Sequence, residues 1–263
     1  MNDLILKNCN IIGADSISFN TDIKISGGRI VDIGIFDEAG IDCSNKFISP
    51  GFIDIHTHGG YGFDFMDSTD EAFDSILRFQ LDNGTTTVLP TSVTAPVAAI
   101  KKFIGTARKY KKKNPPFAKV FGVHLEGPYL SLKNRGAQKE EYILNPQKDD
   151  YSFITDNKDI VRTVTISPEL DVNGAMTKCL SENGIIVCGG HDNGIYPEFI
   201  PSIQNGLKHL THMFCAMSEL RFEEGVRNVG LREYGLLDDS LTAEIIADNK
   251  HIPSELAKLI LKC

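Results

Sequence analysis

Apolar and polar positions alternate along this chain with two periods, which predict helices and strands in turn. Residues 70–83 carry apolar side chains at helical spacing and end in Asn83-Gly84, a frequent helix stop. The apolar run at 85–93 is typical of a buried strand. A second helix is predicted for residues 96–113, because two prolines follow it and prevent its continuation.

The same alternation continues through the second half of the chain. Strands are predicted at the apolar runs 161–166 and 243–248 and at those beginning near 185 and 207. Helices are predicted at 172–183 and 253–262. Strands that alternate with helices form parallel sheets, so the pattern predicts an α/β fold.

The first 48 residues follow a different pattern. Short strand-like runs lie at 4–6, 23–25 and 29–33, and Gly27-Gly28 separates the last two as a hairpin turn would. These residues are expected to form a small β unit of their own.

Two histidines one residue apart introduce candidate chemistry. His56 and His58 lie where an apolar run gives way to glycines. Side chains at positions i and i+2 of a strand point the same way, so the two imidazoles can converge on one metal ion. The spacing alone fits a packed pair of histidines at a strand end equally well.

Three further strand ends carry residues of the same kind. Glu126 follows the run 119–125, His191 follows 184–190, and His212 follows the run that begins at 207. Each alone is more often a surface or core residue, but four such strand ends in one chain indicate a metal site. Sites at the carboxyl ends of strands favour a (β/α) barrel of the triosephosphate isomerase type over an open, doubly wound sheet.

Several short motifs then carry a resemblance to a known family. The chain resembles the amidohydrolase superfamily and, within it, the N-acetylglucosamine-6-phosphate deacetylases. His124-Leu125-Glu126-Gly127-Pro128 is the most specific of these motifs. The others are Pro50-Gly51-Phe52-Ile53-Asp54-Ile55-His56-Thr57-His58-Gly59, Thr85-Thr86-Thr87, Ile166-Ser167-Pro168-Glu169, Gly190-His191 and Leu210-Thr211-His212.

The resemblance implies a domain organisation. Residues 1–48 are expected to be a partial β-sandwich domain, and residues 49–263 an incomplete (β/α) barrel catalytic domain. Seven barrel strands are counted from Phe52, so the fold expected is a (β/α)8 TIM-type barrel that lacks its eighth strand. We therefore expect the chain to be a fragment of a longer protein or a truncated product.

The resemblance also implies metal ligands. Glu126, His191 and His212 would bind the principal divalent ion, and His56 and His58 would share Glu126 around a second one. One or two ions are expected, and such ligands accept zinc, iron or manganese. The catalytic aspartate of the family follows the eighth strand and matches no residue here, which leaves the catalytic residue unknown. Asp248 is a weak substitute, since a structural role is the commoner one for such a residue.

The residues expected to bind substrate depart from the family pattern at three places. His251 and the backbone of Ala216 and Met217 match the pattern. Gln138 and Cys215 stand where the family usually has histidine and asparagine. The phosphate-binding arginine position reads Phe222, with Arg221 and Arg227 close by.

The function implied is metal-dependent hydrolysis of the acetamide of N-acetylglucosamine 6-phosphate to glucosamine 6-phosphate and acetate. Two alternatives stay open: a related amidohydrolase acting on another N-acyl or cyclic amide substrate, and a catalytically inactive, truncated metal-binding remnant. The partner expected is the small-molecule amino-sugar phosphate, and the full-length protein is expected to form a homodimer.

Composition narrows the partners and the compartment. A net charge of −8 and a pI near 5.4 argue against a nucleic-acid or anionic-membrane partner. The sequence has no signal peptide pattern and no transmembrane run, and its six cysteines form no CxxC pair. A cytoplasmic protein with reduced thiols is therefore expected.

Overall fold

The computed structural model describes residues 3–113 and 115–263, which belong to two compact units. The first unit extends to Phe52 and the second runs from Ile53 to Cys263. No helix in the described residues is both long and apolar enough to cross a membrane.

The first unit is built on one sheet with strand order β3-β2-β1-β4, and β5 also pairs with β1. The hairpin predicted at Gly27-Gly28 is confirmed, since Ser26 pairs with Arg29 across it. Both glycines have positive φ angles, 57° and 76°, which glycine adopts without steric cost. The strands are β1 (Leu4–Ile12), β2 (Ile17–Ser26), β3 (Arg29–Gly34), β4 (Ile41–Asp42) and β5 (Phe47–Ile48).

A buried carboxylate ties this unit together. Asp22 in β2 accepts hydrogen bonds from the backbone N–H groups of Asn8 (2.9 Å) and Phe36 (3.0 Å). The Lys7 ammonium lies 2.8 Å from Asp22 Oδ2, the oxygen that also accepts from Phe36. The hydrogen bond from Lys7, followed by those from the two backbone groups, lowers the pKa of Asp22 from 3.8 to about 2.

Asp22→Asn is therefore expected to make stability less dependent on pH. The folded-state pKa lies below the unfolded one, so the carboxylate stabilises the fold above about pH 4 and loses this effect as the pH falls toward 2. Thermal unfolding at pH 7 should give the variant a lower Tm than the wild type, and the difference should shrink toward pH 2. A difference in Tm that stays constant from pH 7 to pH 2 would contradict this reading.

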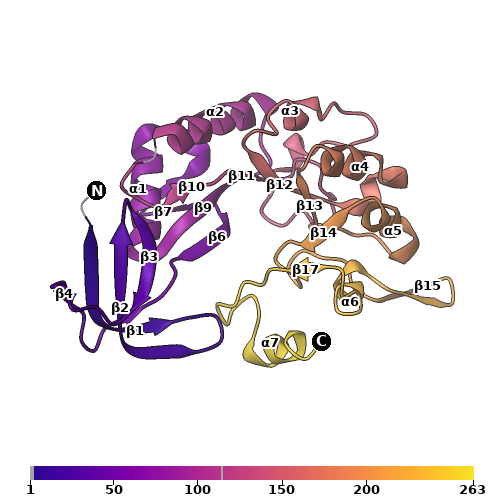
Figure 1. Ribbon diagram of the computed structural model, residues 1–263. Coiled ribbons are helices and arrows are strands. Elements are labelled where there is room, and N and C mark those ends of the chain that lie inside the picture. The colour runs from indigo at the N-terminus through magenta and orange to yellow at the C-terminus, as the bar shows by residue number, and fades with distance from the viewer. Residues whose placement is uncertain (1–2, 114) are drawn as a thin grey trace. The chain divides into compact units, whose positions relative to one another are not determined.

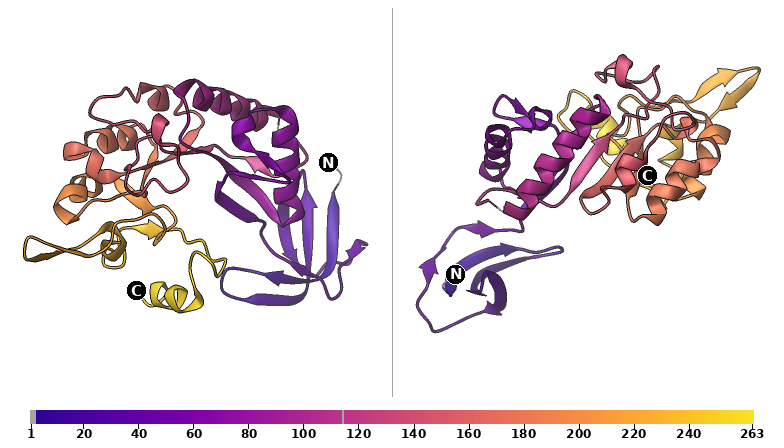
Figure 2. Two further views of the ribbon diagram at one scale, coloured as in Figure 1. Left: turned by 180° about the vertical axis from the view of Figure 1, so that it is seen from behind. Right: turned by 90° about the horizontal axis from the view of Figure 1, so that it is seen from above.

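The second unit contains a curled sheet with helices packed along it. Figures 1 and 2 show the strands following one another around an arc, with α2, α4 and α5 on its outer side. The sheet order is β10-β9-β11-β12-β13-β14-β17, with β6 also pairing with β9. Its strands are β6 (Phe52–Thr57), β9 (Thr85–Ser92), β10 (Lys119–Val120), β11 (Val123–Glu126), β12 (Val161–Ile166), β13 (Ile186–Gly189), β14 (Leu207–Leu210) and β17 (Thr242–Ala243).

The remaining elements cover the sheet or connect its strands. Two short hairpins are formed by β7 (Gly59–Gly60) with β8 (Phe63–Asp64), and by β15 (Arg221–Glu223) with β16 (Val226–Asn228). The helices are α1 (Asp70–Asp82), α2 (Val97–Lys113), α3 (Ser152–Thr155), α4 (Ala175–Glu182), α5 (Tyr196–Gln204), α6 (Leu231–Tyr234) and α7 (Ser254–Ile260).

The fold prediction is confirmed, since the strands form a curled parallel sheet with helices on its outer side (Figure 1), as in an incomplete (β/α) barrel. In the described residues, β6 pairs only with β9 and β17 only with β14. β10 pairs with β9 at Thr87 and Val88 and β11 pairs with it at Thr91 and Ser92, so β10 and β11 follow one another along β9, and β6 and β17 are the ends of the barrel sheet. Apolar side chains from the helices and the sheet form one core between the two layers, which includes Phe73, Ile76, Leu77, Val88, Val164, Leu180, Val187 and Phe199.

Two predicted elements differ from the observed ones. The helix predicted from residue 172 begins at 175, because Asn173 has a φ of 61° and Asp171 accepts the N–H groups of Met176 and Thr177 at 2.8 Å each. The last strand, predicted over 243–248, is confined to Thr242–Ala243.

Candidate metal centre

Five side chains with metal-binding atoms lie at the carboxyl ends of neighbouring strands. His56 is in β6 and His58 follows it, while Glu126 is the last residue of β11. His191 follows β13 and His212 follows β14. Parallel strands end at one edge of a sheet, so residues far apart in the sequence meet here.

Glu126, His191 and His212 form the more buried group. The Nε2 atoms of His191 and His212 each lie 3.0 Å from Glu126 Oε1, and 3.1 Å from each other. His191 and His212 both have positive φ angles, 49° and 32°. Such backbone conformations are sparsely populated and cluster at functional sites.

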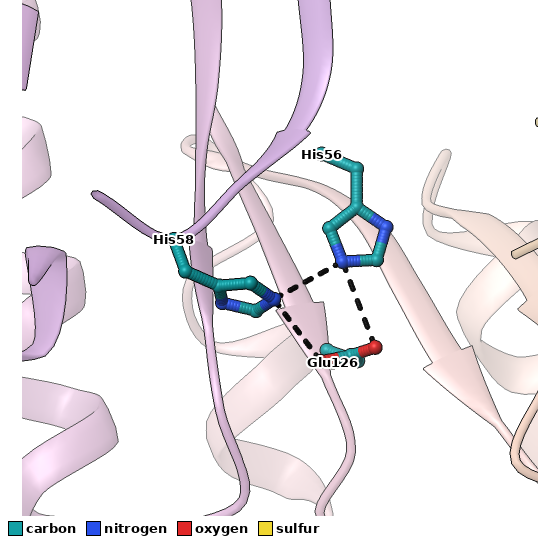
Figure 3. Close-up of side chains that lie close together, drawn as sticks. All are labelled: His56, His58 and Glu126. Atoms are coloured by element: carbon teal, nitrogen blue, oxygen red, sulfur yellow. Dashed lines mark hydrogen bonds and ion pairs between the residues drawn. The ribbon is translucent and has the colours of Figure 1, made fainter. Parts of the chain in front are cut away.

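His56 and His58 form a second group with the same glutamate. Figure 3 shows both imidazoles turned toward Glu126. His58 Nε2 lies 3.3 Å from Glu126 Oε2, and His56 Nε2 lies 3.6 Å from Glu126 Oε1. The two Nε2 atoms are 3.3 Å apart. Glu126 is therefore shared by two histidine pairs.

The donor atoms fit a divalent cation. His191 Nδ1 lies 2.9 Å from the Asn134 carbonyl, which can only accept, so Nδ1 carries the proton. In the neutral ring Nε2 then presents a lone pair to the oxygen of Glu126. Two electron-rich atoms at 3.0 Å need a positive charge between them, and imidazole and carboxylate ligands suit zinc, iron or manganese.

Burial and hydrogen bonding act in opposite directions on Glu126. Burial raises its pKa, but the imidazoles of His191, His212 and His58 that face the carboxylate outweigh burial and hold the pKa well below its ordinary value. Glu126 is therefore an ionised carboxylate at neutral pH, which is the form that binds metals.

Gln138 supports Glu126 from the side of the cleft. Its amide nitrogen donates to Glu126 Oε2 at 2.5 Å, and its amide oxygen accepts the N–H of Thr94 at 2.7 Å. Both ends of this buried side chain are thus engaged within the protein. Gln138, which was expected to contact substrate, therefore also orients the carboxylate of Glu126.

His124 was not singled out as a site residue from the sequence. It is buried, its Nδ1 donates to the Ile55 carbonyl (3.2 Å), and its Nε2 accepts from the Thr165 hydroxyl (2.7 Å). Burial, followed by the nearby His56, lowers the pKa of His124 to about 3, so the ring is neutral. Its ring centroid lies 4.7 Å from that of His56. The sequence feature that could have indicated His124 is its position two residues before Glu126 in the motif His124-Leu125-Glu126-Gly127-Pro128.

A cleft of about 650 Å³ opens over the two groups. Apolar side chains form much of its wall, and Gln138, Lys139 and His251 contribute polar groups. Its lining residues are His58, Met66, Val93, Thr94, Ala95, Pro96, Ala99, Glu126, Ala137, Gln138, Lys139, Tyr142, His191, His212, Ile246 and His251.

The two arginines expected to bind substrate do not line this cleft. Arg221 donates to the Asn193 carbonyl at 2.8 Å and lies 3.0 Å from Glu223. Arg227 lies over the Phe222 ring in the β15–β16 hairpin, which Figure 1 labels at β15. In the structure described here, their guanidinium groups are engaged with the hairpin and the loop after β13.

The remaining predicted residues also lie outside the cleft lining. Cys215 and Ala216 are half-buried and Met217 is buried, in the loop after His212. Asp248 is exposed and accepts from the Nδ1 of His251 at 2.8 Å. The backbone N–H of His251, followed by that of Lys250, lowers the pKa of Asp248 to about 2.

Comparison with known proteins identifies the family. The family model described as the Amidohydrolase family matches residues 47–262. The chain belongs to the amidohydrolase family. Amidohydrolases are metal-dependent, and the cluster of histidines around Glu126 fits that property.

Its relatives include N-acetylglucosamine-6-phosphate deacetylases, as the motifs implied. The Danio rerio deacetylase is 33% identical over 80% of this chain and 55% of its own length. The Lysinibacillus sphaericus deacetylase is 29% identical over 95% of this chain and 65% of its own length. This amidohydrolase chain thus spans between about half and two thirds of these curated relatives.

A solved structure has the same fold over the whole chain. It is a mutant N-acetyl-D-glucosamine-6-phosphate deacetylase from Mycobacterium smegmatis in complex with N-acetyl-D-glucosamine-6-phosphate. The two share 25% identity and a TM-score of 0.88, over 100% of this chain and 68% of that one.

Proposed function

We propose that this chain carries the metal centre and substrate cleft of an N-acetylglucosamine-6-phosphate deacetylase. The observation that carries the proposal is the single carboxylate of Glu126, which two histidine pairs share and which lines the cleft together with His58, His191 and His212. The deacetylases among its relatives support this choice of substrate and reaction.

Glu126, His191 and His212 would hold one divalent ion, and His56 and His58 with Glu126 a second. When bound, such an ion lowers the pKa of a water molecule and polarises a carbonyl group. Gln138 keeps Glu126 oriented toward the histidines through its two hydrogen bonds.

The cleft wall suits the rest of the substrate. Met66, Val93 and Ile246 give it an apolar part that a small acyl group can contact. Lys139 is the one lysine or arginine among the lining residues described, and we assign it, with His251, to the phosphate. Asp248 is turned to His251, so we assign it the orientation of that imidazole rather than proton transfer.

A second candidate substrate is an N-acyl sugar without phosphate. The observation that favours it is the engagement of Arg221 by Asn193 and Glu223, which leaves the cleft without an arginine in the described residues. The arginine fork would otherwise bind two phosphate oxygens at once.

The test is binding and acetate release by the metal-loaded chain, with N-acetylglucosamine 6-phosphate and N-acetylglucosamine compared. Calorimetry should show tighter binding of the phosphorylated sugar, and Lys139→Met should reduce that preference. Acetate release should follow metal loading and stop in His212→Ala. Equal binding of both sugars would favour the second candidate, and neither binding nor release would contradict the proposed function.

A further inference from the structure

Glu244 lies directly behind the metal centre, where β17 ends. Its backbone N–H donates to the Leu210 carbonyl (3.0 Å), and its own carbonyl accepts the N–H of Met213 (2.7 Å). These bonds attach Glu244 to both sides of His212. Its side chain is 16% exposed and does not line the cleft.

One oxygen of this carboxylate contacts both histidine groups. Glu244 Oε1 lies 2.5 Å from His56 Nδ1 and accepts the backbone N–H of His212 at 3.1 Å. The second oxygen lies 3.7 Å from His209 Nε2. A histidine from the start of the sheet and one from near its other end thus share a partner.

The contact with His56 decides which of its nitrogens is free. Glu244 Oε1 acts as an acceptor for the N–H of His212, and as an acceptor it also takes the proton of His56 Nδ1, which is therefore the protonated nitrogen of that ring. Nε2 then presents its lone pair toward Glu126 and His58. In the described residues, Nδ1 of His56 has no other hydrogen-bond partner. Without Glu244, the proton of the His56 ring is free to move from Nδ1 to Nε2, and the Nε2 lone pair is then no longer available to a metal ion.

The Glu244 carboxylate lies beside the cluster that Glu126 occupies, in contact with His56 and with the backbone of His212. Carboxylates hydrogen-bonded to ligating histidines orient the ring and raise its basicity.

We propose that Glu244 is a positioning residue of the metal centre, which holds His56 as an Nε2 ligand and holds the backbone of His212. The inference rests on the metal centre proposed above and not on the identity of the substrate. Glu244 contacts neither the cleft nor the reacting atoms, so it acts through these histidines.

The test measures metal affinity rather than activity. Cobalt or zinc is titrated into the metal-free 263-residue chain against a chromophoric chelator. Glu244→Met, which keeps the side-chain length and removes the acceptor, should weaken binding by about 10- to 100-fold. Glu244→Gln keeps an acceptor for His56 Nδ1 and should recover part of the loss. Glu255→Gln, an exposed position in α7, is the matched control and should change nothing.

A double-mutant cycle separates positioning from a general structural effect. In a His56→Ala background, Glu244→Met should cost much less affinity, since the histidine it positions is gone. An equal loss of metal affinity in both backgrounds, or unchanged affinity in Glu244→Met, would overturn the role of Glu244 and leave the proposed metal centre standing. A wild-type chain that binds no metal would overturn the metal centre as well.

A measurement on the wild type needs no variant. The ¹⁵N chemical shifts of the His56 ring in the zinc-loaded chain should show a proton on Nδ1 and none on Nε2. A proton on Nε2 would overturn the proposal.

Discussion

Glu126→Gln is expected to remove metal binding from both histidine groups at once. Glu126 Oε1 lies 3.0 Å from the Nε2 atoms of His191 and His212, and Oε2 lies 3.3 Å from that of His58. The substitution removes the one carboxylate that the two groups share and leaves imidazole nitrogens facing a neutral amide. Because a direct ligand is lost, the affinity should fall by more than the roughly 100-fold typical of an outer partner.

Metal content after dialysis, measured by elemental analysis, checks this expectation. Glu141→Gln, at an exposed position after Gln138, is the matched control and should keep the metal content of the wild type. Acetate release should disappear in Glu126→Gln and not in the control. A Glu126→Gln chain that retains two ions would show that the shared carboxylate is not a ligand.

The strand ends of this chain were predictable because they depend on local pattern. The predicted strand 161–166 agrees with β12, and the predicted helix 70–83 with α1. Long runs with helical periodicity, or runs of apolar residues, are compatible with few other secondary structures. Once the strands were placed, parallel topology brought the residues at their carboxyl ends together. The sequence alone is therefore enough to group His191 with Glu126.

Glu244 could not be found in this way, although it lies within the strand predicted over 243–248. Its partner His56 is 188 residues away in the sequence. Whether a carboxylate at a strand end points to the cluster or away from it depends on register and side-chain direction, which a single sequence does not show. His124 was not predicted for a related reason. The sequence around a histidine in a buried strand does not show whether its imidazole binds a metal ion or only packs against the residues that do.

The arginines illustrate the opposite difficulty. Arg221 was expected at the substrate because of its position in a family pattern, yet its guanidinium contacts Asn193 and Glu223. A loop residue has several possible partners of similar strength, and sequence position does not choose between them. The expectation for Arg221 and Arg227 remains a prediction that substrate binding will test.

Phe73→Ala is expected to have the largest effect on the stability of the barrel unit. Phe73 is fully buried in α1, and its ring lies 4.9 Å from those of Phe65 and Tyr110 and 6.5 Å from that of Phe103, between centroids. Truncating it removes apolar burial and leaves a cavity between α1 and α2 that rigid aromatic neighbours fill poorly. A loss of about 3–5 kcal/mol in the free energy of unfolding is expected.

Urea unfolding followed by far-ultraviolet circular dichroism measures that loss, with Phe222→Ala as the control. Phe222 is the same residue type but is 66% exposed in the β15–β16 hairpin, so its removal should change the free energy of unfolding by no more than about 0.5 kcal/mol. Equal effects of the two substitutions would mean that the aromatic cluster around Phe73 is not part of the cooperative core. A large effect at Phe73 alone would show that the contact between α1 and α2 supports the sheet on which the metal ligands lie.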